Sequence, residues 1–262
     1  MENQKNDIHY FYQNLNDESS RFNVSRAESV EFLTTMRYLE MICPKNSGIL
    51  DACAGTGVYA FPLAKLGHKV TAGDLVDYNV SHIRDYQKSN PLLKEIYTGS
   101  IIDLSLFADS SFDVVLNLGS FYHLIDEEDR VKSIKESLRV LKPNGIYYMS
   151  YLNKYSNYFK FRERMNDNFD TFEEYIGKGY NDKNQIFYAT MPEDVEYFMN
   201  QFEIEQMNNI ATDGLKFVYR DTINLFDDKT FERWLNIHFR SCEIKSLLGY
   251  SEHGLYIGRK NK

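Results

Sequence analysis

The feature that most restricts the fold of this sequence is a regular alternation of two kinds of segment over its first 152 residues. Five short apolar runs are typical of buried strands: 48–53, 69–74, 95–99, 112–118 and 146–152. Longer segments before and between these runs have apolar residues at helical spacing: 28–41, 58–66, 77–89 and 127–141. Strands that alternate with helices form a parallel sheet covered on both faces, so we expect a doubly wound α/β fold.

Composition excludes several classes of function for these 262 residues. The formal net charge is −8, and no cluster of Lys and Arg is present, so we expect no nucleic-acid partner. No apolar run is long enough to span a bilayer, and the polar N-terminus does not resemble a signal peptide, so we expect no membrane partner. The three cysteines are far apart and form no CxxC pair, which predicts neither disulfides nor a metal site and favours a cytoplasmic location.

The turn after the first strand, residues 51–57 (DACAGTG), is the most informative motif. Gly55 and Gly57 let the backbone turn tightly and approach a ligand, at the strand end where open α/β sheets bind ligands. A GxG pattern alone also fits a simple turn. Asp74 ends the second strand about twenty residues after Gly55, the spacing at which a carboxylate binds a ribose diol. Together, the two features predict a ribose-bearing cofactor.

The third glycine of a dinucleotide-binding motif is replaced here by Ala60, which some NAD-binding proteins tolerate, so this position does not distinguish between cofactors. Asp51 is more informative. A carboxylate ahead of the turn would repel a pyrophosphate, but it suits the ammonium group of S-adenosylmethionine (SAM).

The sequence resembles class I SAM-dependent methyltransferases, of the small-molecule type with an LGxxYHL block after the fourth strand. The matching segments are ILDACAGTG (49–57), VTAGDL (70–75), DSSFDVVLNLGSFYHL (109–124) and ESLRVLKPNGIYYMSYL (136–152), with later matches at 195–215 and 251–260. The resemblance implies a Rossmann-like, mostly parallel, seven-stranded sheet whose last strand is antiparallel. Two late apolar runs, 202–210 and 254–259, fit the last two strands.

The resemblance also implies which residues bind SAM. They are Asp51, Ala52, Gly55, Thr56 and Gly57 in the turn, Asp74 and Leu75 at the ribose and adenine, Ser100 and Ile101 at the adenine edge, and Asn117, Leu118 and Gly119 beside the methionine part. Relatives usually have Asp-Ala where this chain has Ser100 and Ile101. Recognition of the adenine amino group is therefore expected to shift to a backbone group or to Asp103.

Catalysis of methyl transfer depends mainly on aligning the acceptor with the methyl group, and a base helps only when the acceptor carries a proton. His123 lies just beyond the fourth strand, where such a base would stand. The alternative is a structural histidine that shapes the loop. Tyr122 also has two interpretations: it is either a catalytic residue or part of the wall of the SAM pocket.

We expect residues 1–46 to form an N-terminal helical arm or lid and residues 47–262 to form the SAM-binding methyltransferase domain. An aromatic-rich, irregular segment at 153–190 is interpreted as a helical cap insertion over the substrate. In the arm, residues 10–12 and Arg21 would close over SAM, with Arg21 near its carboxylate. An exposed arm is the alternative.

The sequence therefore predicts a SAM-dependent methyltransferase with a small-molecule acceptor that it does not identify, acting as a monomer or homodimer. Nucleic-acid amino-methyltransferases carry prolines after the fourth strand, where this chain has residues 117–120 (NLGS). Two alternatives remain from other classes: an NAD-dependent oxidoreductase, which leaves the LNLGSFYHL block unexplained, and a SAM-binding protein without catalysis.

Overall fold

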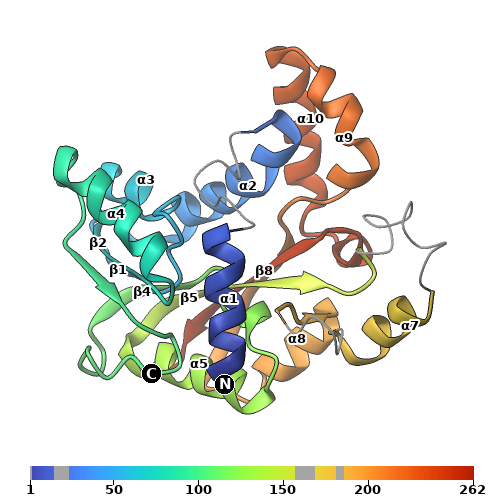
Figure 1. Cartoon of the computed structure of the whole chain (residues 1–262). Helices are drawn as coiled ribbons and strands as arrows, with labels where there is room; N and C mark the ends of the chain where they lie inside the picture. The colour runs from blue at the N-terminus through green and yellow to red at the C-terminus, as the bar shows by residue number, and fades with distance from the viewer. Residues whose placement is uncertain (1, 15–23, 157–168, 181–185) are drawn as a thin grey trace.

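A computed structural model describes residues 2–14, 24–156, 169–180 and 186–262 of the chain (Figure 1). Its centre is one sheet with the strand order β3-β2-β1-β4-β5-β8-β7. The strands are β1 (Gly48–Asp51), β2 (Lys69–Asp74), β3 (Glu95–Thr98), β4 (Phe112–Asn117), β5 (Leu141–Asn153), β7 (Ile204–Ala211) and β8 (His253–Lys260). The seven expected strands are confirmed, and a short eighth strand joins the same sheet.

The direction of the strands also agrees with the expectation. The strands β1 to β5 pair in parallel, whereas β8 pairs antiparallel with both β5 and β7. The order reverses between β1 and β4, which is the point where doubly wound sheets bind their ligands. A two-residue strand, β6 (Ala189–Thr190), pairs in parallel with the end of β5 and was not expected from the sequence.

Helices cover both faces of the sheet because the side chains of each strand alternate between two buried layers. Ile49 and Leu116 pack with α2 (Arg26–Ile42), α3 (Ala60–Lys65) and α4 (Asp77–Ser89). Leu50 and Val115 face the opposite layer, with α5 (Glu127–Val140) and α8 (Pro192–Met199). Burial of apolar side chains on both faces contributes about 25 cal/mol per Å². The two layers together hold the carboxyl ends of β1 and β4 in a fixed position.

Some element boundaries differ from the expected ones. The helix α3 begins at Ala60 rather than at residue 58, because the backbone turns through two positive φ angles at Gly55 and Gly57. The strand β5 begins at Leu141, with a register irregularity opposite the start of β4, so residues 142–145 continue the strand rather than end the preceding helix.

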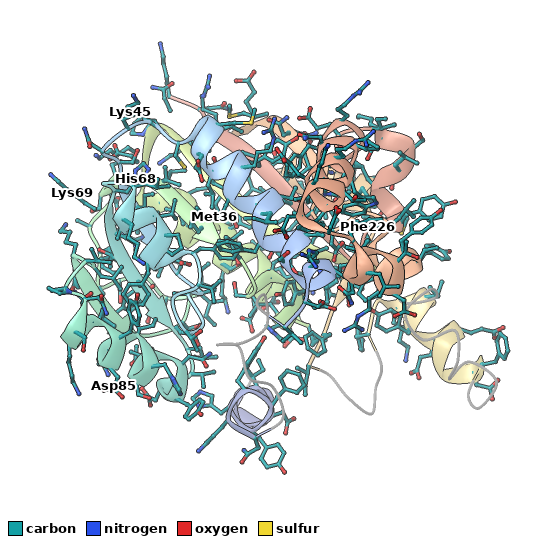
Figure 2. The ribbon with its side chains drawn as sticks, turned by 90° about the horizontal axis from the view of Figure 1, so that it is seen from above. Met36, Lys45, His68, Lys69, Asp85 and Phe226 are labelled. Atoms are coloured by element: carbon teal, nitrogen blue, oxygen red, sulfur yellow. The ribbon has the colours of Figure 1, made fainter. Side chains whose placement is uncertain are left out.

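The connection from β7 to β8 holds a pair of helices, α9 (Lys216–Leu225) and α10 (Asp228–Ser241), followed by the short 3-10 helix η3 (Lys245–Tyr250). The sequence pattern did not predict α9. Both α9 and α10 pack against α2, and they lie beside its end in Figure 1. Figure 2 shows Met36 of α2 between Asp85 of α4 on one side and Phe226, just after α9, on the other.

The N-terminal segment contains α1 (Glu2–Asn14) ahead of α2, and α7 (Phe169–Lys178) lies in the expected cap segment. The predicted lid residue Arg21 and, within the predicted cap, residues 157–168 and 181–185 lie outside the described residues. Among the helices that the structure describes, none is both long and apolar enough to cross a membrane.

Candidate functional site

A cavity opens at the point where the strand order reverses, at the carboxyl edge of the sheet. Most of its lining comes from the residues that directly follow four neighbouring strands. These are Ala52, Cys53 and Gly55 after β1, Asp74, Leu75, Val76 and Asn79 at and after β2, Gly99, Ser100 and Ile101 after β3, and Leu118, Gly119 and Ser120 after β4. The 3-10 helix η1 (Phe121–His123) adds Tyr122 and His123, followed by Leu124, and α1 adds Ile8 and Tyr12.

The glycine turn has a conformation that requires glycine. Gly57 has a φ of +90°, and a Cβ built at this position would lie 2.7 Å from the ring of Phe61. Gly55 has a φ of +53°, and its amide donates a 2.8 Å hydrogen bond to Oδ2 of Asp74. The turn after β1 is therefore held against the end of β2 by the same carboxylate that the sequence assigned to the ribose.

Asp74 is fixed by its surroundings and has 8% of its surface exposed. Its Oδ1 accepts hydrogen bonds from the amide of Val76 at 2.9 Å and from Nδ2 of Asn79 at 3.2 Å. Asn79 was not predicted as a site residue. Its position in the first turn of the helix that follows Asp74 could have indicated it. The carboxylate is thus pre-oriented at the cavity wall, which limits the conformational entropy lost when it binds a ligand.

Asp51, the last residue of β1, is fully buried, and neither of its carboxylate oxygens has a hydrogen-bond partner among the described residues. Burial, followed by the negative charge of Asp74, raises the pKa of Asp51 to about 7, and the backbone amide of Cys53 offsets this rise only in part. A buried carboxylate without a partner is costly and is usually tied to function. Asp51 directly precedes the wall residue Ala52, so its charge favours a ligand that brings positive charge to this part of the cavity, as the methionine part of SAM does.

The predicted cofactor residues fall into two groups. The structure brings Ala52, Gly55, Asp74, Leu75, Ser100, Ile101, Leu118 and Gly119 together on the cavity wall. Asp51, Thr56, Gly57, Asp103 and Asn117 are not part of that wall. Within this second group, Asn117 is buried and donates to the hydroxyl of Tyr147 at 2.9 Å. Asp103 is exposed, and its pKa is lowered by hydrogen bonds from the hydroxyl and the amide of Ser105.

The predicted catalytic residues Tyr122 and His123 are both buried and line the cavity. The two ring nitrogens of His123 have different partners. Nδ1 lies 2.8 Å from the carbonyl oxygen of Ile186, and Nε2 lies 2.7 Å from the hydroxyl of Tyr12 on α1. The sequence did not predict the contact between Tyr12 and His123, because no local pattern links residues so far apart in the chain.

A second, smaller cavity lies directly beside the first and shares four wall residues with it: Cys53, Gly55, Leu118 and Tyr122. Its other polar lining residues are Glu31, Thr35, Tyr59, Ser150 and Thr212. This cavity adjoins the first cavity across the glycine turn and the residues that follow β4. Its hydroxyls and carboxylate can hold a polar small molecule there.

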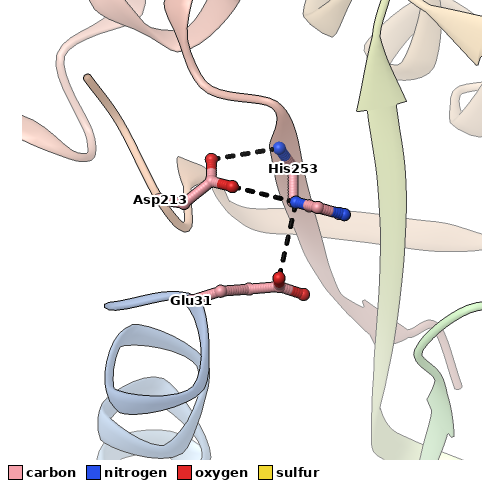
Figure 3. A group of neighbouring side chains, drawn as sticks. All are labelled: Glu31, Asp213 and His253. Atoms are coloured by element: carbon pink, nitrogen blue, oxygen red, sulfur yellow. Dashed lines mark hydrogen bonds and ion pairs between the residues drawn. The ribbon is translucent and has the colours of Figure 1, made fainter. Parts of the chain in front are cut away.

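Behind this second cavity, three buried side chains from α2, the end of β7 and the start of β8 converge, as Figure 3 shows. Nδ1 of His253 lies 2.9 Å from Oδ2 of Asp213 and 3.4 Å from Glu31. Burial lowers the pKa of His253, but the charges of Glu31, Glu252 and Asp213 outweigh it and raise the pKa above its usual value. The ammonium of Lys216 lies 3.3 Å from Oδ2 of Asp213, so a cation already compensates this group and we assign no metal to it.

Comparison with known proteins agrees with this geometry. The sequence profile of a methyltransferase domain matches residues 50–149. A glycine/sarcosine N-methyltransferase of Aphanothece halophytica is 27% identical over 171 residues, which cover 60% of this chain and 61% of that protein. A ubiquinone biosynthesis O-methyltransferase of Pelagibacter ubique is 33% identical over 110 residues, covering 42% of this chain and 44% of the relative. The chain thus spans about half the length of these curated relatives.

Two solved structures share the fold across nearly the whole chain. A SAM-dependent methyltransferase from Methanosarcina mazei has a TM-score of 0.58 at 19% identity, and the match covers 85% of this chain and 96% of that protein. The second is the 1,6-didemethyltoxoflavin-N1-methyltransferase of Burkholderia thailandensis, solved with bound 1,6-didemethyltoxoflavin and S-adenosylhomocysteine. It has a TM-score of 0.60 at 13% identity, and the match covers 98% of this chain and 87% of that protein. Residues 50–149 therefore belong to the class I SAM-dependent methyltransferase family, whose methyl donor is SAM.

Proposed function

We propose that this chain transfers a methyl group from SAM to a small-molecule acceptor. The observation that carries the proposal is the cavity at the β1–β4 reversal, whose wall includes the glycine turn and the pre-oriented carboxylate of Asp74. In this assignment Asp74 accepts hydrogen bonds from the ribose hydroxyls, and Leu75 packs on the adenine. Ser100 and Ile101 border the adenine edge, while Asp51 offsets the positive charge of the methionine ammonium.

SAM supplies an electrophilic methyl group, and the chain has to hold an acceptor in line with it and keep water away. The first cavity, with the glycine turn and Asp74 on its wall, is the cofactor-side cavity of this proposal. The second cavity is the proposed acceptor site, because it adjoins the cofactor-side cavity through shared walls at Gly55, Leu118 and Tyr122. Its small volume and the hydroxyl and carboxylate groups in its lining favour a small polar molecule. The curated relatives include both N- and O-methyltransferases by name, so an acceptor panel has to contain amines as well as hydroxyl compounds.

The N-terminal arm of residues 1–46 and the cap at 153–190 belong to the same proposal. Support for the arm is that Ile8 and Tyr12 of α1 line the cofactor-side cavity. Support for the cap is that Ile186 accepts a hydrogen bond from the ring of His123. A reducing compartment such as the cytoplasm is proposed because Cys43, Cys53 and Cys242 are all free thiols.

Ligand binding tests this proposal and separates it from the oxidoreductase alternative. We expect calorimetry to show binding of SAM and S-adenosylhomocysteine but not of NAD. Asp74→Asn should weaken S-adenosylhomocysteine binding at least tenfold, because the amide loses one acceptor oxygen and the negative charge that hold the ribose. The matched control is Asp85→Asn, an exposed carboxylate on the outer side of α4.

An unfolding transition unchanged from that of the wild type would show that Asp74→Asn is folded when its binding is measured. Binding of NAD with no binding of S-adenosylhomocysteine would contradict the proposal. Binding of S-adenosylhomocysteine together with no methylation across the acceptor panel would instead favour a SAM-binding protein without catalysis.

A further inference from the structure

The first helix brings a tyrosine to the side chain predicted to act as base. The hydroxyl of Tyr12 lies 2.7 Å from Nε2 of His123, and the two rings meet edge to face with centroids 5.5 Å apart. The neighbouring Phe11 makes a second edge-to-face contact, 5.5 Å from Phe187. Both Tyr12 and His123 line the cofactor-side cavity, and neither lines the second cavity. The two cavities share Tyr122, whose ring centroid lies 5.0 Å from that of His123, so an acceptor would reach the pair where the cavities join beside Tyr122.

The hydrogen bonds of His123 determine which of its nitrogens carries the proton. A backbone carbonyl can only accept, so Nδ1, at 2.8 Å from the carbonyl oxygen of Ile186, must be the protonated nitrogen. In the neutral ring Nε2 then holds the lone pair and accepts the hydrogen bond of the Tyr12 hydroxyl. The basic atom of His123 is therefore covered by Tyr12, and a proton from the cavity reaches it through the phenol oxygen.

We propose that Tyr12 is a catalytic residue that receives the proton of the acceptor and passes its own proton to His123. This inference rests on the proposed function. In the step, the O–H or N–H bond of the acceptor breaks and its proton goes to the Tyr12 oxygen. At the same time the Tyr12 O–H bond breaks and that proton goes to Nε2 of His123. The acceptor keeps the electron pair, which becomes the nucleophile for the methyl group.

The surroundings of the pair support this direction of transfer. The imidazolium that forms on His123 keeps its Nδ1 hydrogen bond to the carbonyl of Ile186, and this bond becomes stronger when the donor is charged. Tyr12 stays neutral overall because it gains one proton and loses another. The relay therefore specifies an acceptor class: a molecule whose nucleophilic atom carries a dissociable proton, such as a hydroxyl or an N–H group, rather than a thioether or a tertiary amine.

The same helix provides a matched control. The sequence pattern placed Tyr10 in the lid together with Tyr12, but in the structure Tyr10 is 61% exposed and is not part of the cavity wall that Tyr12 lines. Tyr12→Phe removes only the hydroxyl and retains the ring that packs on His123, so the lid packing is preserved. Tyr10→Phe removes the same group from the exposed side of the helix.

The first experiment reads the tautomer and needs no acceptor. In ¹⁵N NMR of the wild type with S-adenosylhomocysteine, assigned by loss of the signals in His123→Gln, we expect a protonated Nδ1 and an unprotonated Nε2. Tyr12→Phe should shift the Nε2 resonance, and Tyr10→Phe should not. A neutral ring protonated at Nε2 overturns the relay. If S-adenosylhomocysteine does not bind at all, the proposed function fails, and the spectrum of the free protein still tests the Tyr12 contact.

The second experiment measures kcat with the member of the amine and hydroxyl panel that the wild type methylates fastest. Tyr12→Phe should lower kcat about 100-fold, the usual scale of a lost acid–base group, with less than a twofold change in the Kd of S-adenosylhomocysteine. The double variant Tyr12→Phe with His123→Gln should be no slower than the slower single variant, because the two residues act as a unit. An unchanged kcat in Tyr12→Phe, or an equally large loss in Tyr10→Phe, overturns the proposal.

Discussion

Two buried aspartates stand at the same edge of the sheet in opposite situations. Asp51 ends β1, and neither of its oxygens has a hydrogen-bond partner among the described residues. Asp213 follows β7 and is equally buried, but it contacts Lys216, His253 and Ser251. The pKa of Asp51 is raised by burial, whereas the charges and donors around Asp213 overcome its burial and lower the pKa below its usual value.

We interpret the difference as one between a carboxylate that serves the proposed ligand and a carboxylate that holds the fold. The group around Asp213 joins α2, the start of α9 and the start of β8, so it fixes the helices beside the second cavity. Asp51 connects no elements through its side chain, and its desolvation is a cost that the chain alone does not recover. The comparison can be tested by removing charge from each region in turn.

Lys216→Met should have the largest effect on stability. Methionine fills a similar volume, but Asp213 and its acidic neighbours are left buried without the ammonium, whose side chain is 3% exposed. Removing one partner of a buried ion pair costs about 3–5 kcal/mol. Urea unfolding at pH 7 measures the change, and Lys245→Met, which removes an exposed ammonium paired with Glu196, serves as the control. A loss no larger than that of the control would mean that Asp213 is not held by Lys216.

Asp51→Asn should change stability in the opposite direction. The pKa of Asp51 is raised to about 7, against about 3.9 in an unfolded chain, so between these values the folded state binds a proton that the unfolded state has released. Stability from this group is therefore present below pH 4 and is lost as the pH rises to 7. Without ligand, Asp51→Asn should be about 1–3 kcal/mol more stable than the wild type at pH 8 and nearly equal to it at pH 4.

The same substitution should weaken binding of S-adenosylhomocysteine at least tenfold, because the ligand loses its buried anionic partner. Unfolding curves at the two pH values and calorimetry at pH 8 measure both effects. The idea that Asp51 is reserved for a ligand fails if the asparagine variant is less stable at pH 8 while its binding is unchanged.

His253→Gln should have the smallest effect, and one that depends on pH. The folded-state pKa of His253 is raised, so the stability it contributes is complete below the unfolded pKa of about 6.5 and is lost as the pH rises through the folded value. Glutamine can still donate to Asp213 but carries no charge. We expect a loss of about 1 kcal/mol at pH 6 that shrinks by pH 9. A loss that grows with rising pH would contradict the assigned charge of His253.

The comparison also shows which parts of the molecule could be predicted from the sequence. The turn with Gly55 and the carboxylate of Asp74 lie close together along the chain, and their spacing alone placed them on adjacent strand ends. Asp213 and His253 meet across the long connection between β7 and β8, and their ion pair left no local pattern. The helix α9 was missed for a related reason: β-branched residues such as Val218 and Ile223 weaken its helical propensity, and its packing on α2 compensates.

The antiparallel direction of β8 has a consequence for how this fold can vary. Because β7 ends and β8 begins at the carboxyl edge of the sheet, residues 212–252 leave and return on the side where the cavities lie. A tight hairpin could join two such strands, so the part of this excursion that lies beyond the group of Asp213, Lys216 and His253 can vary while the sheet hydrogen bonds stay intact. Changing the length or sequence of that part would alter the surroundings of the second cavity, where we propose that the acceptor binds, and would leave the first cavity unchanged. It is therefore a suitable segment to graft between relatives when a new acceptor is wanted.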